Sequence, residues 1–318
     1  MTPASVAEPS PQRLANPLLR YLLATRPAFF GITLAGCLLG FATARHAGVA
    51  LDPYSAGLTL LLALLTHAGV NVLNDYYDHL NGSDPHNTDR LYPYTGGSRF
   101  IQNGVMSPRQ TLTFGLLLFA TVIAGGVWLV GQAGLGLFWI GLAGLILGWA
   151  YSAPPLKLAH RGLGELAVLA GFLLVVVGAD YVQRGAFDPL PWLAGLPYAL
   201  LTVNILYINQ FPDRRADLLA GKRHWVARLA PGRAAQVYGL ILGLAGAWLI
   251  GVSLGGALPQ AALWALAGML PALVADRLLQ AHAAAPARLR PAIRATIAAA
   301  LLHTLLLAGI LMALGRSA

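Results

Sequence analysis

The fold class follows from residues 54–84, which read YSAGLTLLLALLTHAGVNVLNDYYDHLNGSD. Residues 54–74 are predominantly apolar, and the run has about the length of 20 residues that a helix needs to cross the hydrocarbon core of a membrane. Amides and carboxylates then gather where this helix would leave the apolar layer. The stretch therefore predicts a transmembrane helix that carries reactive groups at one membrane surface.

Eight further apolar runs of similar length occur in the chain, so we expect an all-α, polytopic membrane protein with about nine transmembrane helices. The expected spans are residues 28–46, 54–74, 110–130, 134–152, 163–182, 192–211, 235–255, 260–279 and 293–314. Short connections near Gly131–Gln132 and Gly255–Pro259 predict two antiparallel helix hairpins. We expect residues 1–27 to form an N-terminal segment and residues 28–318 to form a single transmembrane domain.

The composition excludes several other classes of protein. Only 10% of the 318 residues are charged, against roughly 25% in an average soluble domain, and 57% are hydrophobic. Cys37 is the single cysteine, which excludes a disulfide scaffold. The net charge of +9 comes from scattered basic residues that form no stripe, so we expect no nucleic-acid partner.

The distribution of basic residues predicts the orientation of the chain in the membrane. If the N-terminus is cytoplasmic, 18 of the 21 Lys and Arg residues fall on the cytoplasmic side, and only Arg45, Arg184 and Arg316 fall on the other. Loops that carry an excess of Lys and Arg stay in the cytoplasm. We therefore expect the N-terminus and the two long polar loops, 75–109 and 212–234, to face the cytoplasm. The expected location is a bacterial inner membrane.

Carboxylates are concentrated in and beside those two loops. Six of the twelve acidic residues lie there, namely Asp75, Asp78, Asp84, Asp89, Asp213 and Asp217. Asn71, Asp75 and Asp78 are spaced so that they share one face of a helix, as are Asn209, Asp213 and Asp217. The two matching clusters predict an approximate internal repeat of spans one to four and five to eight, with the ninth span left over.

The chemistry of these clusters points to a divalent cation. Like charges on one helix face repel each other, and a bound cation would remove that cost. Carboxylate and amide oxygens suit Mg²⁺, which commonly shares the phosphate oxygens of a substrate. Two facing clusters would thus make a diphosphate site clamped by one or two Mg²⁺ ions. The alternative is that the acids pair with local arginines and mark solvated helix ends.

The combined motifs resemble those of the UbiA superfamily of intramembrane aromatic prenyltransferases. The resemblance covers nearly the whole chain and includes both acid motifs and Tyr151-Ser-Ala-Pro-Pro-Leu-Lys157. Within the superfamily, the chain is most similar to the 1,4-dihydroxy-2-naphthoate polyprenyltransferase branch. The features that carry this similarity are Asn71-x-x-Asn74-Asp75-Tyr-x-Asp78, Gly82-x-Asp84, Thr95-Gly-Gly-Ser98, Ile101-Gln-x-Gly104, Arg161-Gly-Leu-Gly-Glu165 and Asp217-x-x-x-Gly221-Lys222.

The resemblance implies a UbiA-like bundle, dependence on Mg²⁺, a polyprenyl diphosphate donor drawn from the lipid, and an aromatic acceptor used in menaquinone biosynthesis. On this basis Asp75 and Asp78 would bind one Mg²⁺, and Asp213 and Asp217 a second. The residues expected to contact substrate are Asn71, Asn74, Lys157, Arg161, Asn209, Lys222 and Arg223. The ring of Tyr151 would stabilise an allylic cation, and Asp84 would orient or deprotonate the acceptor.

Other functions stay open at this point. Departures from the branch pattern, such as His224-Trp225 after Lys222-Arg223, leave room for 4-hydroxybenzoate, homogentisate, a tetrapyrrole or a lipid alcohol as the acceptor. A cation-coupled transporter is an alternative of another class, but transporter sites tend to lie near the midplane on broken helices. A non-catalytic scaffold would leave both acid clusters unexplained.

Overall fold

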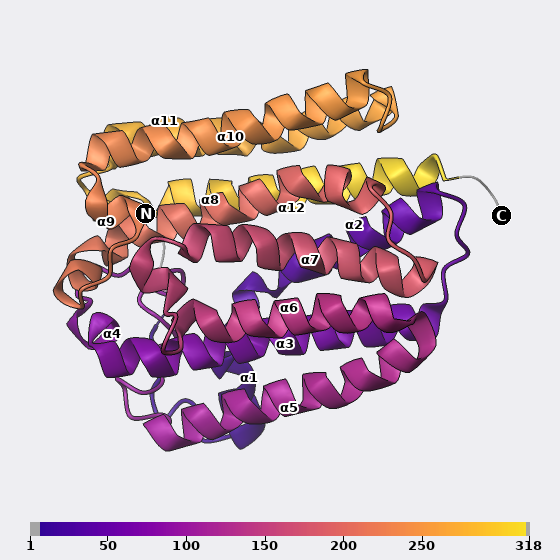
Figure 1. Ribbon diagram of the computed structural model, residues 1–318. Coiled ribbons are helices and arrows are strands. Elements are labelled where there is room, and N and C mark those ends of the chain that lie inside the picture. The colour runs from indigo at the N-terminus through magenta and orange to yellow at the C-terminus, as the bar shows by residue number, and fades with distance from the viewer. Residues whose placement is uncertain (1–6, 316–318) are drawn as a thin grey trace.

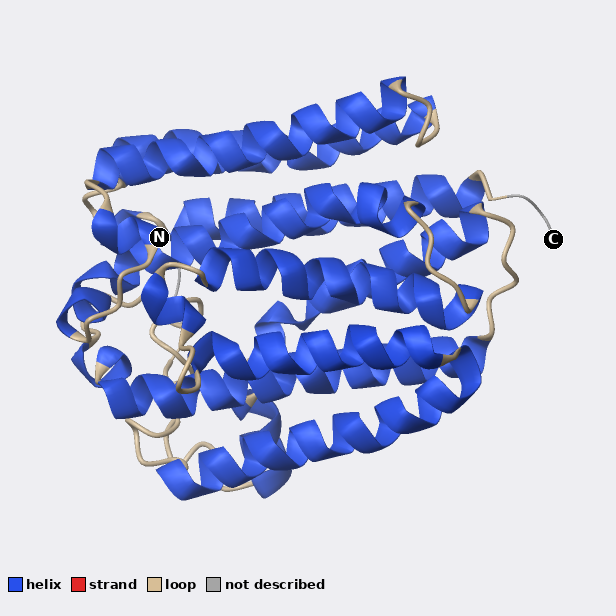
Figure 2. Cartoon of the chain, in the orientation of Figure 1, coloured by secondary structure: helices blue, strands red, loops and turns tan. Residues whose placement is uncertain are grey.

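The computed structural model describes residues 7–315, which form helices and connecting segments without any strand (Figures 1 and 2). Nine helical segments in this range are long and apolar enough to cross a membrane, as expected. They are η1 with α2 (Pro27–His46), α3 (Pro53–Asn81), α5 (Pro108–Ala133), α6 (Leu135–Ser152), α7 (Gly164–Arg184), α8 (Leu190–Leu219), α10 (Pro231–Leu254), η3 with α11 (Gln260–His282) and α12 (Arg290–Ala313). The shorter helices are α1 (Pro17–Ala24), α4 (Ser83–His86), η2 (Leu158–Arg161), α9 (Trp225–Arg228) and η4 (Pro286–Arg288). Residues 1–6 of the expected N-terminal segment and residues 316–318, with Arg316, lie outside the described range.

Two helices continue well beyond the ends expected from hydropathy. The expected spans ended at residues 74 and 211, but α3 continues to Asn81 and α8 to Leu219. The helix is retained because its polar face turns toward the protein, where Asp78 and Asp217 are buried. The expected loop bounds, 75–109 and 212–234, are therefore corrected: Asp75, Asp78, Asp213 and Asp217 lie within α3 and α8, and the segments joining α3 to α5 and α8 to α10 are residues 82–107 and 220–230.

The centre of the bundle is formed by α2, α7, α8 and α12 (Figure 1). Helix α2 approaches α7 so closely that a Cβ atom on Gly40 would lie 2.3 Å from the carbonyl oxygen of Val176. Close helix contacts in membrane proteins depend on such small residues. The hydroxyl of Tyr198 on α8 donates to the carbonyl oxygen of Ile32 on α2 at 3.0 Å, which ties the third helix into this centre.

The connections differ between the two ends of the bundle. The longer connections, with α4 and α9, gather at the left end in Figure 1, and the tight turns between α5 and α6 and between α10 and η3 lie at the right end. The carboxyl-terminal ends of α3 and α8 both point to the left end. This arrangement brings the two acid motifs to the same end of the molecule.

Candidate active site

A cavity of about 660 Å³ lies among α2, α3, α5, α6, α7 and α8. Its lining on α3 runs from Thr59 to Asp78, which corresponds to about 28 Å at the rise of an α-helix. Asp78, Asp213 and Lys222 line its polar end, whereas the rest of the lining is mainly apolar. The cavity therefore suits a long molecule with a charged head and an apolar tail.

The two acid motifs meet at the polar end of this cavity. The ammonium nitrogen of Lys222 lies 2.9 Å from Oδ1 of Asp78 on α3 and 3.1 Å from Oδ1 of Asp217 on α8. Lys222 lies three residues after the end of α8, and its side chain is about nine-tenths buried. One cation thus joins carboxylates from two helices that are more than 100 residues apart in the sequence.

The segment after α4 orients the carboxylates of both motifs. The backbone N–H of Ser98 donates to both oxygens of Asp75 at 3.2 Å. The backbone N–H of Gly96 donates to Oδ2 of Asp213 at 3.3 Å, and the side-chain amide of Asn87 donates to Oδ1 of the same residue at 2.6 Å. A single loop therefore fixes one carboxylate on α3 and one on α8.

Gly97 lets this loop approach the carboxylates closely. It has a φ of +73°, in the left-handed region that favours glycine. A Cβ atom at this position would lie 2.4 Å from Oδ2 of Asp84 and 3.0 Å from Oδ1 of Asp75. Gly97 is thus required both by the backbone conformation and by the space that these two acids occupy.

His224 makes a hydrogen bond to Oδ2 of Asp217. Nδ1 of His224 accepts from the backbone N–H of Ala227 at 3.2 Å, so the ring hydrogen of the neutral imidazole lies on Nε2. Nε2 then donates to Oδ2 of Asp217 at 3.0 Å. Because the two oxygens of Asp217 are divided between His224 and Lys222, its carboxylate has a fixed orientation.

The charges at this end are crowded. Burial raises the pKa of Asp84 well above its ordinary value, and the carboxylates of Asp78 and Asp75 raise it further. Burial alone would lower the pKa of Lys222, but the carboxylates of Asp217 and Asp78 outweigh it and raise this pKa well above its usual range. Lys222 therefore stays cationic, and the surplus of negative charge around it favours a further cation.

The oxygen donors present fit Mg²⁺ shared with a phosphate ligand. Oδ2 of Asp84 and Oδ1 of Asn209 are buried without a hydrogen-bond partner among the described residues. Within residues 7–315, no three His, Cys, Asp or Glu side chains form a ready-made metal-binding group. Mg²⁺ needs no such cage, because it is usually held by one or two carboxylates together with substrate phosphates and water.

Most of the residues expected to form the site do line the cavity. They are Asn71, Asn74, Asp78, Asp84, Tyr151, Asn209, Asp213, Asp217 and Lys222. Asp75 is buried beside the cavity but is not part of its lining. Lys157, Arg161 and Arg223 also lie outside the lining, and the side chains of Arg161 and Arg223 are on the exposed surface of the loops.

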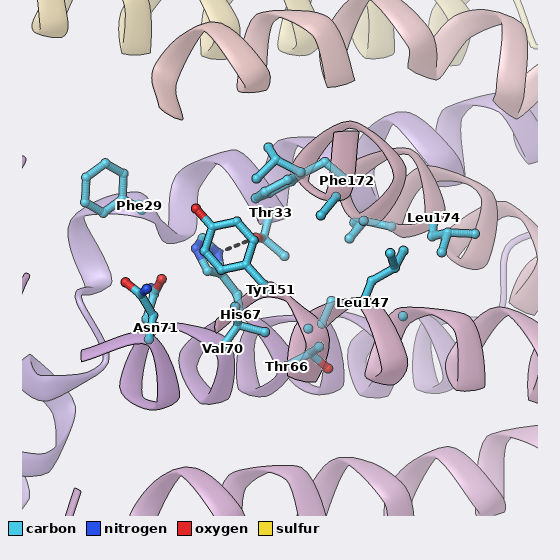
Figure 3. A pocket seen from close by; sticks show the side chains of 18 of the residues that line it. Phe29, Thr33, Thr66, His67, Val70, Asn71, Leu147, Tyr151, Phe172 and Leu174 are labelled. Atoms are coloured by element: carbon cyan, nitrogen blue, oxygen red, sulfur yellow. Dashed lines mark hydrogen bonds between the residues drawn. The ribbon is translucent and has the colours of Figure 1, made fainter. Parts of the chain in front are cut away.

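The structure adds residues that the sequence did not single out for the site. Asn87 and His224 orient carboxylates, but neither has a spacing that relates it to the acid motifs. The sequence did single out the Thr95-Gly-Gly-Ser98 stretch as a motif, but it did not predict that this stretch contacts the carboxylates. Figure 3 shows Tyr151 with His67, Thr33 and Phe172 around a common space further along the cavity.

Comparisons with known proteins identify the family. Residues 33–297 match the model of the UbiA prenyltransferase family. The chain is 29% identical to UbiA prenyltransferase domain-containing protein 1 of Gallus gallus over 226 residues, which are 70% of this chain and 65% of that protein. It therefore matches slightly less than two thirds of that relative's length.

Two further similarities cover nearly the whole chain. The chain is 28% identical to 1,4-dihydroxy-2-naphthoate octaprenyltransferase of Escherichia coli (strain K12) over 296 residues, 90% of this chain and 92% of that protein. The solved structure of a UbiA homolog from Archaeoglobus fulgidus bound to GPP and Mg²⁺ has a TM-score of 0.58 at 18% identity, and covers 92% of this chain and 99% of that chain. The chain belongs to the UbiA prenyltransferase family and is an integral membrane prenyltransferase.

Proposed function

We propose that this protein transfers a polyprenyl group from polyprenyl diphosphate to 1,4-dihydroxy-2-naphthoate in a Mg²⁺-dependent reaction. The observation that carries the proposal is the cavity, which joins two facing acid motifs at one end to a long apolar wall. The naming of the Escherichia coli relative as a 1,4-dihydroxy-2-naphthoate octaprenyltransferase supports this choice of acceptor. The position of the acids at the ends of intact helices favours chemistry over cation transport.

The donor would lie with its diphosphate at the polar end and its prenyl chain along the apolar wall. Lys222 and the amides of Asn71, Asn74 and Asn209 line that end and would contact the phosphate oxygens. Lys157, Arg161 and Arg223 lie outside the cavity lining, so the proposal places the diphosphate on Lys222 and not on them.

The proposed metal ligands are the four carboxylates of the two motifs. Asp78, Asp213 and Asp217 line the cavity, whereas Asp75 would have to exchange its bonds with the Ser98 amide for the metal. When bound, Mg²⁺ supplies positive charge that stabilises the leaving diphosphate.

The chain's own residues would control the remaining chemistry. As the bond between the prenyl carbon and the diphosphate oxygen breaks, the Lys222 ammonium lies close to the charge that develops on the diphosphate. The π face of Tyr151 would stabilise the allylic cation, and the apolar wall would keep water away from it. The electrons of the acceptor ring then form the new carbon–carbon bond, and the ring carbon loses its proton. The free oxygen of Asp84 is the proposed acceptor of that proton.

We also propose that the acid end faces the cytoplasm of a bacterial cell. Eighteen of the 21 basic residues fall on that side when the N-terminus is cytoplasmic. The positive-inside rule supports this orientation. Polyprenyl donors would then enter from the lipid, and a charged acceptor would enter from the cytoplasm.

Turnover by the purified protein tests the proposed function. The protein in detergent is incubated with Mg²⁺, radiolabelled polyprenyl diphosphate and either 1,4-dihydroxy-2-naphthoate or 4-hydroxybenzoate. A Mg²⁺-dependent prenylated naphthalene product is the expected result. Product with 4-hydroxybenzoate alone would overturn the proposed acceptor and retain the reaction class. No product with either compound would contradict this reading of the site.

A further inference from the structure

A histidine occupies the apolar part of the cavity, away from the charged end. His67 lies on α3 and lines the cavity, two helical turns before Asp75. Eight residues of an α-helix span about 12 Å along its axis, so the imidazole lies well away from the carboxylates of α3. Its ring packs against Phe30 and Phe172, with centroids 5.6 and 5.7 Å away. A polar ring in such surroundings needs hydrogen-bond partners.

One nitrogen of this ring already has its partner. Nδ1 of His67 lies 2.7 Å from the hydroxyl oxygen of Thr33 on α2, as the dashed line in Figure 3 shows. Thr33 is only 1% exposed. Among the residues that the structure describes, Nδ1 is the one hydrogen-bond partner of this hydroxyl, so the hydroxyl hydrogen has no other protein acceptor there. The hydroxyl therefore donates to Nδ1, because the reverse arrangement would bury an unsatisfied hydroxyl hydrogen.

This hydrogen bond determines what the other side of the ring offers. With Nδ1 accepting, the neutral imidazole carries its hydrogen on Nε2. Nε2 has no hydrogen-bond partner in the described part of the chain, although the residue lines the cavity. The hydroxyl of the neighbouring Thr66, by contrast, has a hydrogen-bond partner, because it donates to the carbonyl oxygen of Leu62 in its own helix at 2.8 Å. The N–H at Nε2 of His67 is thus a hydrogen-bond donor without a protein partner within the described range, in a ring that Thr33 holds in place and apolar side chains surround.

The chemistry of the two substrates decides which of them can use this donor. A prenyl chain is a hydrocarbon and accepts no hydrogen bond. The diphosphate belongs at the acid end, and Asn71, the residue of that end nearest to His67 on α3, lies one helical turn, about 6 Å, away along the helix. An aromatic acceptor, by contrast, carries hydroxyl or carboxylate oxygens on a flat ring, which suits a donor flanked by aromatic side chains.

We propose that His67, held by Thr33, donates a hydrogen bond from Nε2 to an oxygen of the aromatic acceptor and thereby sets which ring carbon faces the prenyl cation. This inference rests on the proposed function and adds an acceptor-binding residue to it. His67 binds the acceptor directly, and Thr33 is a positioning residue that acts through the imidazole.

The test compares four variants of the full-length protein. His67→Phe keeps an aromatic ring and removes the donor, whereas His67→Gln retains an N–H donor. Thr33→Val removes the hydroxyl at nearly constant volume. Thr304→Val on α12 is the matched control, because Thr304 is also fully buried but its hydroxyl bonds, within residues 7–315, only to the carbonyl oxygen of Ala300 in its own helix.

The readout is the KM for each substrate, measured separately, together with the thermal stability of each variant. Loss of one hydrogen bond should raise the KM for 1,4-dihydroxy-2-naphthoate about tenfold in His67→Phe, with a smaller rise in Thr33→Val. The KM for polyprenyl diphosphate should stay within about twofold, and His67→Gln should recover part of the loss. Thr304→Val should leave both KM values unchanged.

Two results would overturn the inference: an unchanged acceptor KM in His67→Phe, or equal rises in both KM values. Equilibrium dialysis of the protein with 1,4-dihydroxy-2-naphthoate, without polyprenyl diphosphate, separates this inference from the proposed function. Failure of the wild-type protein to turn over refutes the proposed function. If the wild-type protein binds the acceptor and His67→Phe binds it equally well, the proposed role of His67 is refuted.

Discussion

Lys222 is the residue on which the two acid motifs converge, so its removal should affect catalysis more than that of any surface lysine. We expect Lys222→Met to lower kcat about 100-fold, the effect of losing one group that stabilises developing charge. Lys157 is a useful comparison, because it was expected from the sequence to bind phosphate but does not line the cavity. Lys157→Met should change kcat less than tenfold. Equal losses in the two variants would contradict the placement of the diphosphate on Lys222.

Gly97 allows a separate test of the geometry around the acids. Gly97→Ala would place a methyl group against Asp84 and Asp75, so we expect a higher Mg²⁺ requirement and at least a tenfold loss of turnover, on the scale of about 1.4 kcal/mol for each factor of ten.

Gly104→Ala is the matched control for this substitution. Gly104 has a similar φ of +69°, but a Cβ atom there would meet nothing within 4 Å. It should lose about 1–2 kcal/mol of stability from its left-handed backbone and keep the Mg²⁺ dependence of the wild type. Similar Mg²⁺ titrations for the two variants would show that backbone strain, and not contact with the carboxylates, causes the effect at Gly97.

At the scale of single residues, helix-face spacing was the informative part of the sequence. Of the residues it grouped, Asn71, Asp78, Asp213 and Asp217 line one cavity, whereas Asp75, four residues after Asn71, does not. The residues that orient these carboxylates could not be found in that way. Asn87 and His224 reach them through the path of a loop, and no local periodicity encodes that path.

The loop between α4 and α5 is the element that links the two motifs. Asn87→Leu would remove the side-chain amide that donates to Asp213, so we expect the apparent affinity for Mg²⁺ to fall about tenfold, as for other partners that orient metal ligands.

Asn103→Leu in the same loop is the control, because Asn103 bonds to Glu8 and the carbonyl oxygen of Pro9 in the N-terminal segment. Its Mg²⁺ titration should match that of the wild type. An unchanged titration in Asn87→Leu would mean that the loop does not position Asp213.

At the scale of elements, hydropathy located all nine expected spans, but it ended α3 and α8 too early. The reason is physical: hydropathy measures contact with lipid, whereas these helix ends are stabilised by buried polar contacts within the protein. Asn74, for example, donates to Asp78 at 3.1 Å and to the hydroxyl of Ser152 on α6 at 3.0 Å. Such partners depend on the tertiary fold, so a hydropathy pattern does not predict them.

At the scale of the whole molecule, the orientation in the membrane can be tested by labelling. In a Cys37→Ser background, His86→Cys marks the end with the long connections and Gln132→Cys marks the opposite end. With intact bacterial cells, a membrane-impermeant maleimide should label Gln132→Cys and not His86→Cys. The reverse pattern would place the acid motifs outside the cytoplasm and contradict the proposed orientation.

The internal repeat stays a prediction at this scale. It rests on the similarity between the motif at Asn71, Asp75 and Asp78 and the motif at Asn209, Asp213 and Asp217. The fold itself was predictable because nine apolar runs leave few ways to satisfy the backbone in lipid. The shape of the cavity was not predictable, since it depends on how six helices pack around a space.

The central claim is that carboxylates from α3 and α8 together hold Mg²⁺ and a diphosphate. The most direct measurement is titration calorimetry of a polyprenyl diphosphate into the purified protein, with Mg²⁺ and after chelation by EDTA. We predict binding that requires Mg²⁺ and that weakens at least about tenfold in both Asp78→Asn and Asp213→Asn, one variant on each helix. Binding that is equally strong in EDTA, or that is unchanged in both variants, would contradict the account.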